Sequence, residues 1–159
     1  MTTEDAHEVA ELIKGERFGF LTTISTSGKL TSRPMTLQEV EFDGDLWFFA
    51  ERDSHPVADI RSRPQVNVGI GSGGTWVSLT GQATVVDDVA KKKELWNSGV
   101  EAWFPSGPED PQVVLLKVDA DSAEYWNSPG GRLATAFSFV KAKVSGERID
   151  AGENESVRL

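Results

Sequence analysis

Apolar and polar residues alternate along several short stretches of this chain. Residues 18–25, FGFLTTIS, are rich in aromatic and β-branched side chains, and residues 29–36, KLTSRPMT, follow after the sequence TSG. Such side chains favour strands, and a short connection that contains glycine is typical of a hairpin. The pattern therefore predicts an antiparallel hairpin over residues 18–36.

A second hairpin is predicted at Asp43 and Gly44, which form a favoured two-residue turn between residues 41–42 and the aromatic strand 46–50. Three more segments alternate, and the last is expected to supply two strands: residues 65–71, 75–86 and 112–127. The first two of these flank the sequence GSGG and predict a third hairpin. Six or more strands in hairpins predict a mainly β fold, an antiparallel barrel that is closed or half-closed.

Three segments outside the strands have helical patterns instead, the first of them at the N-terminus. The first is amphipathic and begins at a capping threonine, Thr2 or Thr3. The second follows Ser54, a favoured N-cap, and carries Pro56 where a first-turn proline is tolerated. The third covers residues 87–96 and has an acidic N-terminus. The barrel is therefore expected to carry a few short peripheral helices.

Other segments have no clear strand pattern. Glycine and proline interrupt residues 98–111, which are expected to form a loop. Residues 130–144 are compatible with a short helix or with an extended segment that covers the barrel. Residues 146–159 are expected to be a solvated tail. Because 159 residues suit one core, we predict a single domain over residues 1–145 followed by this tail.

Composition argues against several classes of function. A net charge of −9 without a basic stripe opposes binding to nucleic acid. No apolar run approaches the roughly 20 residues of a membrane-spanning helix, and no membrane partner is expected. The absence of cysteine removes disulfides, iron–sulfur clusters and cysteine nucleophiles. The acidic, amphipathic N-terminus is unlike a secretory signal, which makes the cytoplasm the expected compartment.

Motifs for metal binding and hydrolysis are missing from the sequence. The two histidines, His7 and His55, lie far apart, and no carboxylates stand at metal-ligand spacing, so no metal site is expected. No Gly-x-Ser-x-Gly sequence marks a nucleophile elbow. No Lys-Ser or Lys-Thr pair follows the glycines of GSGG, which favours a hairpin turn over a phosphate loop.

Arg33 and Ser54 are the candidates for binding a phosphorylated ligand. A guanidinium can fork onto a phosphate, and a serine at a helix N-terminus adds a second anion-binding device. Pro34 belongs on an edge strand or at an irregularity, where the freed backbone can face a ligand. The structural alternative is that Arg33 pairs with Glu39 or Glu51 at the surface.

An aromatic run, Trp47, Phe48 and Phe49, lies beside these candidates. Its rings offer flat apolar surface to the ring system of a ligand. The alternative is that the aromatic side chains simply fill the barrel.

Four segments in a fixed order carry a family resemblance: GFLTTISTSGKLTSRPM, LWFFAERDSHPVADI, VSLTGQATVV and WFPSGPEDPQVVLLKVDADSAEYWN. Together they span nearly the whole chain. They resemble the flavin-binding split-barrel proteins related to pyridoxamine 5′-phosphate oxidase, in particular the bacterial general stress protein branch. The resemblance implies a split β-barrel homodimer that binds FMN in two symmetric grooves at the dimer interface.

The resemblance also implies which residues hold the flavin: Arg33, Pro34, Met35, Thr36, Phe49, Ala50, Ser54, His55, Trp76 and Trp103. The arginine lies on the phosphate, which Ser54 and His55 also approach, and the other positions line the ribityl chain and ring. Trp76 reaches the cofactor from the partner subunit, and Trp103 lies in a loop that covers it. A tryptophan buried at a dimer interface, however, needs no ligand to explain it. No catalytic acid or base is identified.

Two departures from the family pattern bear on the ligand. Many relatives have a lysine two residues after the serine of the phosphate loop, where this chain has Pro56. Either phosphate affinity is reduced or His55 substitutes for the lysine. The arginine-rich C-terminal motif that holds pyridoxal phosphate in the true oxidase is not visible, which disfavours vitamin B6 oxidation.

The expected function is that of an FMN-binding, general stress-type protein and flavin-dependent oxidoreductase of unknown substrate. In such a protein the flavin carries the hydride chemistry, and the chain supplies orientation and shielding. Two alternatives stay open. One is a flavin-binding or flavin-sensing module without enzymatic activity, and the other is the same fold with FAD, a deazaflavin or haem in place of FMN.

Overall fold

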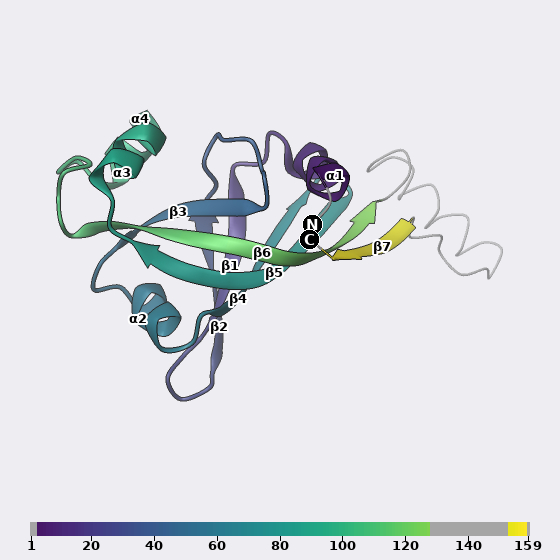
Figure 1. Ribbon diagram of the computed structural model, residues 1–159, viewed down its shortest axis with the longest axis horizontal. Coiled ribbons are helices and arrows are strands. Elements are labelled where there is room, and N and C mark those ends of the chain that lie inside the picture. The colour runs from purple at the N-terminus through teal and green to yellow at the C-terminus, as the bar shows by residue number, and fades with distance from the viewer. Residues whose placement is uncertain (1–2, 128–152, 159) are drawn as a thin grey trace.

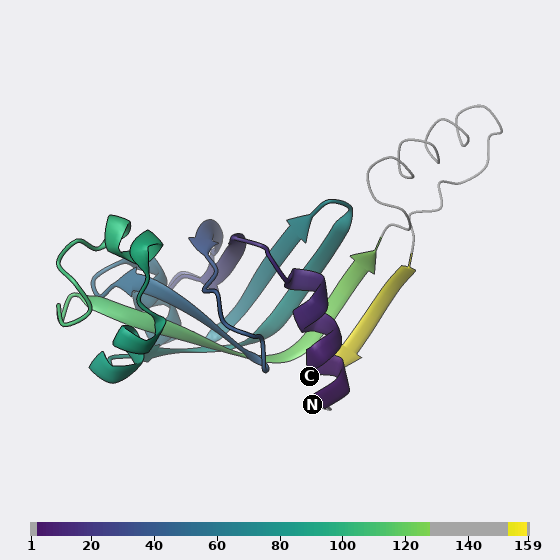
Figure 2. The same ribbon diagram turned by 90° about the horizontal axis from the view of Figure 1, so that it is seen from above.

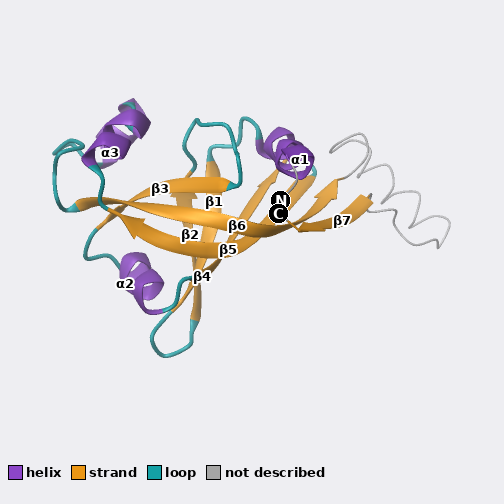
Figure 3. Ribbon diagram, in the orientation of Figure 1, coloured by secondary structure: helices purple, strands orange, loops and turns teal. Residues whose placement is uncertain are grey.

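One antiparallel sheet forms most of the molecule and curls into a half-barrel (Figure 1). The computed structural model describes residues 3–127 and 153–158. Hydrogen-bonded neighbours follow the order β2-β1-β4-β5-β6-β3, and β7 pairs with β6. The strands are β1 (Phe18–Ile24), β2 (Leu30–Thr36), β3 (Asp45–Glu51), β4 (Gln65–Ser72), β5 (Thr75–Val86), β6 (Val113–Asn127) and β7 (Glu153–Arg158). The predicted mainly β, antiparallel split barrel with short peripheral helices is confirmed (Figure 3).

Two of the three predicted hairpins are present. β1 and β2 pair along their whole length. β4 and β5 are joined at Gly73 and Gly74, whose φ angles of 59° and 109° suit a tight hairpin turn and are rarely adopted by other residues. Both hairpins carry their turn signal within a few residues of sequence.

The predicted hairpin at Asp43 and Gly44 is wrong. Residues 41–42 form no strand, because Phe42 turns into the core and is 5% exposed. β3 pairs with β6 instead. The turn itself is present, since Gly44 has a φ of 113° and its carbonyl accepts a hydrogen bond from the backbone N of Ala120.

β6 is one strand of 15 residues where the sequence predicts two. Its first half pairs with β3 and its second half with β7, while β5 pairs along its other edge. The β5–β6 register shifts between Thr80 and Gly81, as a β-bulge does. A Cβ on Gly81 would clash with the backbone of Asp119, so this close approach requires glycine.

The described residues contain four helices: α1 (Thr3–Ile13), α2 (His55–Ser62), α3 (Val89–Leu95) and α4 (Ser98–Trp103). Three confirm predicted helices, and α4 corrects the predicted loop over residues 98–111. Asn97 Oδ1 caps α4 by accepting from the backbone N of Gly99 and Val100. α1 lies toward one end of β6 and the α3–α4 pair toward the other (Figure 2). No helix in the described part of the chain is long and apolar enough to cross a membrane.

Two hydrophobic cores lie on opposite faces of β3. Phe48 and Ala50 face the main core, which the inward residues of the other strands and of α1 complete. Phe49 faces a second core that includes Leu95 and Val100 from the α3–α4 region. β3 is therefore covered on both faces, which fixes the position of the residues at its end.

Part of the segment expected to be a solvated tail forms a strand. β7 pairs with β6 from Arg158 opposite Ser122 to Glu153 opposite Asn127, a pairing that the sequence did not predict. Residues 130–144 lie outside the described residues. The domain boundary at residue 145 stays a prediction.

Candidate functional site

β2 and β3 are the two edge strands of the sheet path, and they approach each other without pairing. We call this opening the β2–β3 seam and define it by residues 33–36 of β2 and 45–50 of β3. Pro34 lies on this edge strand, where a residue without an N–H is tolerated. Because α2 follows β3 after a short turn, the N-terminus of α2 lies at one end of the seam.

The guanidinium of Arg33 joins a hydrogen-bonded cluster beneath β2. Arg33 Nη1 donates to Thr23 Oγ1 at 2.7 Å and to Leu21 O at 3.4 Å. Thr23 Oγ1 donates to Asp59 Oδ2 at 2.7 Å, and that oxygen lies 3.8 Å from Arg33 Nη2. We call Arg33, Thr23 and Asp59 the arginine cluster. It joins β2, β1 and α2.

The arginine cluster is largely shielded from water. Thr23 has no exposed surface, Asp59 is 9% exposed, and the Arg33 side chain is 19% exposed. Burial lowers the pKa of Arg33, and the Asp59 carboxylate opposes this shift. The surface pairing of Arg33 with Glu39 or Glu51 is therefore wrong, since the carboxylate beside Arg33 is the buried one on α2.

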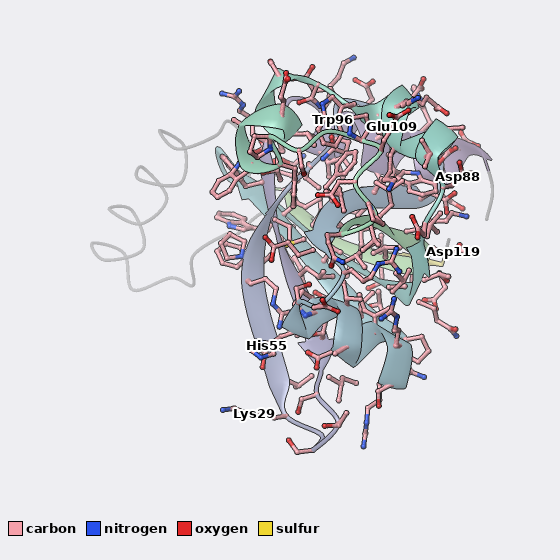
Figure 4. All side chains as sticks on the ribbon, turned by 90° about the vertical axis from the view of Figure 1, so that its left-hand side faces the viewer. Lys29, His55, Asp88, Trp96, Glu109 and Asp119 are labelled. Carbon is pink, nitrogen blue, oxygen red and sulfur yellow. The ribbon has the colours of Figure 1, made fainter. Side chains whose placement is uncertain are left out.

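Ser54 occupies the N-cap of α2, as predicted, but its side chain makes no capping hydrogen bond. Its Oγ is the one buried side-chain N or O atom without a partner among the described residues. His55 begins α2 and is exposed. Figure 4 shows His55 toward the same end of the molecule as Lys29, and Trp96 at the opposite end.

α2 brings Ser54 and the arginine cluster to the same region. Asp59 follows Ser54 by about one and a half turns, roughly 7.5 Å along the helix axis. The N-terminus of a helix carries partial positive charge and unpaired N–H groups, which favour an anion. The guanidinium of Arg33, the hydroxyl of Ser54 and the N-terminus of α2 therefore lie toward the same end of the seam.

Two of the predicted ring-binding residues, Phe49 and Ala50, have buried side chains. Phe49 is 8% exposed and packs edge-on against Trp96, with ring centroids 5.4 Å apart. Ala50 is 6% exposed and faces the main core, against which Met35 also packs. A ligand in the seam would meet the backbone of Phe49 and Ala50, while Thr36 is exposed.

The aromatic run does not form one flat surface. Phe48 is fully buried, and Phe49 lies in the second core, on the opposite face of β3. Trp47 is half-buried, with Lys91 Nζ 4.9 Å and Lys117 Nζ 5.9 Å from its ring centroid. The alternative that the aromatic side chains fill the barrel is confirmed for Phe48, whereas Phe49 fills the second core outside the barrel.

Trp76 lies on an exposed apolar face of the sheet. We call this surface the outer face and define it by five side chains that are between 37% and 67% exposed: Phe18, Phe20, Leu30, Trp76 and Trp126. Trp76 pairs with Trp126 on β6 and with Gly71 on β4, where a Cβ would lie 2.6 Å from its ring. Trp103 is 76% exposed on α4.

A cavity of about 720 Å³ opens where β3 begins, away from α2. It is lined by the end of α1, residues 36–42, the first residues of β3 and residues 97–99. Thr36 alone of the ten predicted cofactor residues lines it. In the described residues, no group of three or more histidine, cysteine, aspartate or glutamate side chains is placed to hold a metal.

Sequence reasoning missed Thr23 and Asp59. The buried position of Thr23 could have been predicted, because Thr23 lies two residues after Leu21 on β1 and its side chain therefore points to the same inward face. The sequence indicates the position of Asp59 less clearly, as a carboxylate between Val57 and Ile60 on the buried side of a short helix. Neither signal names Arg33, which comes from another strand.

Comparison with known proteins identifies similar chains over almost the whole length. The family model described as "Pyridoxamine 5′-phosphate oxidase like" matches residues 4–150. Protein bli-3 of Neurospora crassa is 30% identical over 153 residues, which cover 89% of this chain and 73% of that protein.

Two solved structures are also similar. A putative general stress protein 26 from Jannaschia sp. CCS1 has a TM-score of 0.76 and 25% identity, and the match covers 99% of this chain and 100% of that chain. The general stress FMN/FAD binding protein of Xanthomonas citri has a TM-score of 0.68 and 30% identity, and the match covers 79% of this chain and 90% of that chain.

Proposed function

The chain belongs to the pyridoxamine 5′-phosphate oxidase-like family, and from this premise we propose that it is a flavin-binding protein of the general stress type that binds FMN. A similar protein from Xanthomonas citri is described as a general stress FMN/FAD binding protein. The observation that carries the proposal in this chain is the buried, unpartnered Oγ of Ser54 at the N-terminus of α2.

The phosphate end of the seam suits the phosphate of FMN. A buried hydroxyl without a partner costs about 1–3 kcal/mol, which a phosphate oxygen would recover. The partial positive charge of the helix N-terminus and the guanidinium of Arg33 favour the same anion. His55 adds an imidazole at the position next to Ser54, and no lysine stands two residues after Ser54. The residues present therefore fit a phosphate.

The ring of the flavin is assigned to the β2–β3 seam. In this placement Arg33–Thr36 runs beside the ribityl chain and ring, and Phe49 and Ala50 contribute backbone. Flavin supplies hydride or single-electron transfer when it is bound. The chain would orient the ring and shield it from water, and we assign no residue as an acid or base. We propose an oxidoreductase whose substrate is not identified.

We propose that a second copy of the chain covers the outer face. Five large apolar side chains exposed on neighbouring strands are unusual for a surface that faces water alone. In such a homodimer Trp76 of one copy would reach the flavin of the other, and Trp103 on α4 would cover it.

The experiment that tests the proposal is an absorption spectrum of the purified protein, before and after excess FMN is added and free ligand is removed by gel filtration. We expect the protein to elute at the size of a dimer and to bind FMN, seen as flavin bands that co-elute with it or, where FMN dissociates on the column, as binding in a titration. Absorption bands typical of haem or of a deazaflavin would show that this group, and not FMN, is the ligand. If no flavin is retained, and titration detects no binding, the flavin proposal fails.

Turnover separates the oxidoreductase from a module that only binds or senses flavin. With FMN bound, reduction of the flavin is followed anaerobically during addition of NADH, NADPH and other candidate donors. Rapid bleaching of the flavin band supports the enzyme. Retained flavin that no donor reduces supports the binding module.

A further inference from the structure

Asp59 places a buried negative charge beside the only guanidinium in the seam. Its Oδ2 lies 3.8 Å from Arg33 Nη2 and accepts the Thr23 hydroxyl hydrogen at 2.7 Å. The carboxylate is 9% exposed. A charge that is shielded from water acts on its neighbours more strongly than a surface charge does.

The hydrogen bonds of the cluster have a fixed direction. A carboxylate only accepts, so Thr23 must donate to Asp59 and accept from Arg33. One edge of the guanidinium is thereby committed to Thr23, Leu21 O and Asp59. Within the described part of the chain, Arg33 Nε has no hydrogen-bond partner, which leaves the other edge for a ligand.

We propose that Asp59 is an internal counter-ion that competes with the flavin phosphate for the charge of Arg33, so that FMN binds as an exchangeable ligand instead of a permanently held cofactor. This inference rests on the proposed binding of FMN at the same site. Arg33 carries one positive charge, and Asp59 neutralises it before any phosphate arrives. A phosphate then gains the hydrogen bonds of Arg33 and Ser54 but little net charge attraction.

The direct test is Asp59→Asn, because the asparagine amide oxygen can still accept from Thr23 while the negative charge is gone. Affinities for FMN and for riboflavin, which lacks the phosphate, are measured by quenching of flavin fluorescence. We expect Asp59→Asn to bind FMN roughly tenfold tighter or more, as a charge several ångströms from the phosphate implies. Riboflavin affinity should change less than about twofold.

Two matched variants isolate the charge of Asp59. Asp53→Asn removes an exposed carboxylate next to Ser54, and screening by salt limits its expected effect on FMN affinity to about twofold. Asp59→Asn should also raise the affinity for FMN when Arg33 is replaced by alanine. Arg33→Ala on its own should make FMN bind more weakly than riboflavin. An unchanged or weaker FMN affinity in Asp59→Asn overturns the proposal.

The wild-type protein decides the question if Asp59→Asn does not fold. A neutralised Arg33 predicts that the phosphate improves affinity less than about tenfold over riboflavin. A preference for FMN above about tenfold overturns the counter-ion. If wild-type protein binds neither ligand, the proposed function and this inference both fail. If it binds FMN and the Asp59 variant is no tighter, only the inference fails.

Discussion

Arg33 on β2 donates a 2.7 Å hydrogen bond to the hydroxyl of Thr23 on β1, a side chain with no exposed surface. Thr23 is the link between a guanidinium and a carboxylate that stand farther from each other than a direct hydrogen bond allows. The hydroxyl therefore holds both charged groups in place.

Thr23→Val removes that link while keeping the shape of the side chain. Arg33 and Asp59 would each lose a buried hydrogen bond, so we expect the free energy of unfolding to fall by about 1–3 kcal/mol. Thr31→Val on β2 is the control, since Thr31 is exposed and its replacement should change stability by less than about 0.5 kcal/mol. Urea unfolding measures both. Equal free energies of unfolding for the two variants would show that the Thr23 hydroxyl does not contribute to stability.

Ser54→Ala separates a ligand contact from a structural one. Ser54 Oγ is buried and makes no capping bond or other hydrogen bond in the protein, so its removal should leave the free energy of unfolding of the ligand-free protein unchanged or raise it by up to about 1–3 kcal/mol. FMN affinity should fall by about 0.5–1.5 kcal/mol, because a hydrogen bond to the phosphate is lost, while riboflavin affinity should stay unchanged. Parallel denaturation and FMN titration test this. A stability loss without an affinity loss would make the serine structural.

Lys92 is a fully buried cation whose ammonium group has three acceptors. It donates to Val113 O at 2.8 Å, Asp110 O at 3.2 Å and Asp87 Oδ1 at 3.4 Å. Lys92→Met should lower the free energy of unfolding by about 2–4 kcal/mol, because the buried carbonyl of Val113 and the part-buried carbonyl of Asp110 lose their donor. Its neighbour provides the control: Lys93→Met removes an exposed pair with Glu109 and should cost less than about 1 kcal/mol. Similar losses in both variants would contradict the buried role.

Asp87 makes the stability of the protein depend on acidic pH. The hydrogen bond from Arg52, together with the charges of Arg52 and Lys92, lowers the pKa of Asp87 below its ordinary value near 4. A carboxyl with a lowered folded-state pKa stabilises the protein fully above about pH 4 and progressively less as the pH falls further. Urea midpoints between pH 6 and pH 3 should therefore fall more steeply for the wild type than for Asp87→Asn. Parallel curves would exclude this contribution.

Trp76→Ser tests the homodimer proposed at the outer face. The substitution removes a large exposed ring from the outer face, and we expect the weight-average mass in sedimentation equilibrium to shift from dimer toward monomer. Val89→Ser serves as the comparison and should leave the mass unchanged, because Val89 is 41% exposed but lies on α3, away from the outer face. A wild-type protein that sediments as a monomer would refute the dimer.

The accuracy of prediction from sequence followed the range of the interactions. The hairpins β1–β2 and β4–β5 carry their own turns, and their pairing was predicted. The pairing of β3 with β6 joins segments far apart in the chain, and the local turn at Gly44 pointed to a different partner. α4 was missed because glycine and proline nearby outweighed the cap supplied by Asn97.

The same contrast applies to the candidate site. Ser54 at the N-cap and Pro34 on an edge strand follow from local rules, and the structure places both as expected. The ion-pair partner of Arg33 could not be predicted, because three elements must come together before Asp59 approaches it. Likewise, the burial of Phe49 under the α3–α4 region depends on helices that follow it by dozens of positions.

β3 separates two cores, with Phe48 and Ala50 on one side and Phe49 on the other. Inserting or deleting one residue within β3 would exchange the two sets, since the side chains of a strand alternate. Because both faces of β3 pack against an apolar core, neither face is a polar surface that could accept the displaced side chains. Evolutionary changes in chain length are therefore expected to fall outside β3, in segments such as residues 37–44 and 104–112, and an alignment gap inside β3 would itself signal a misalignment.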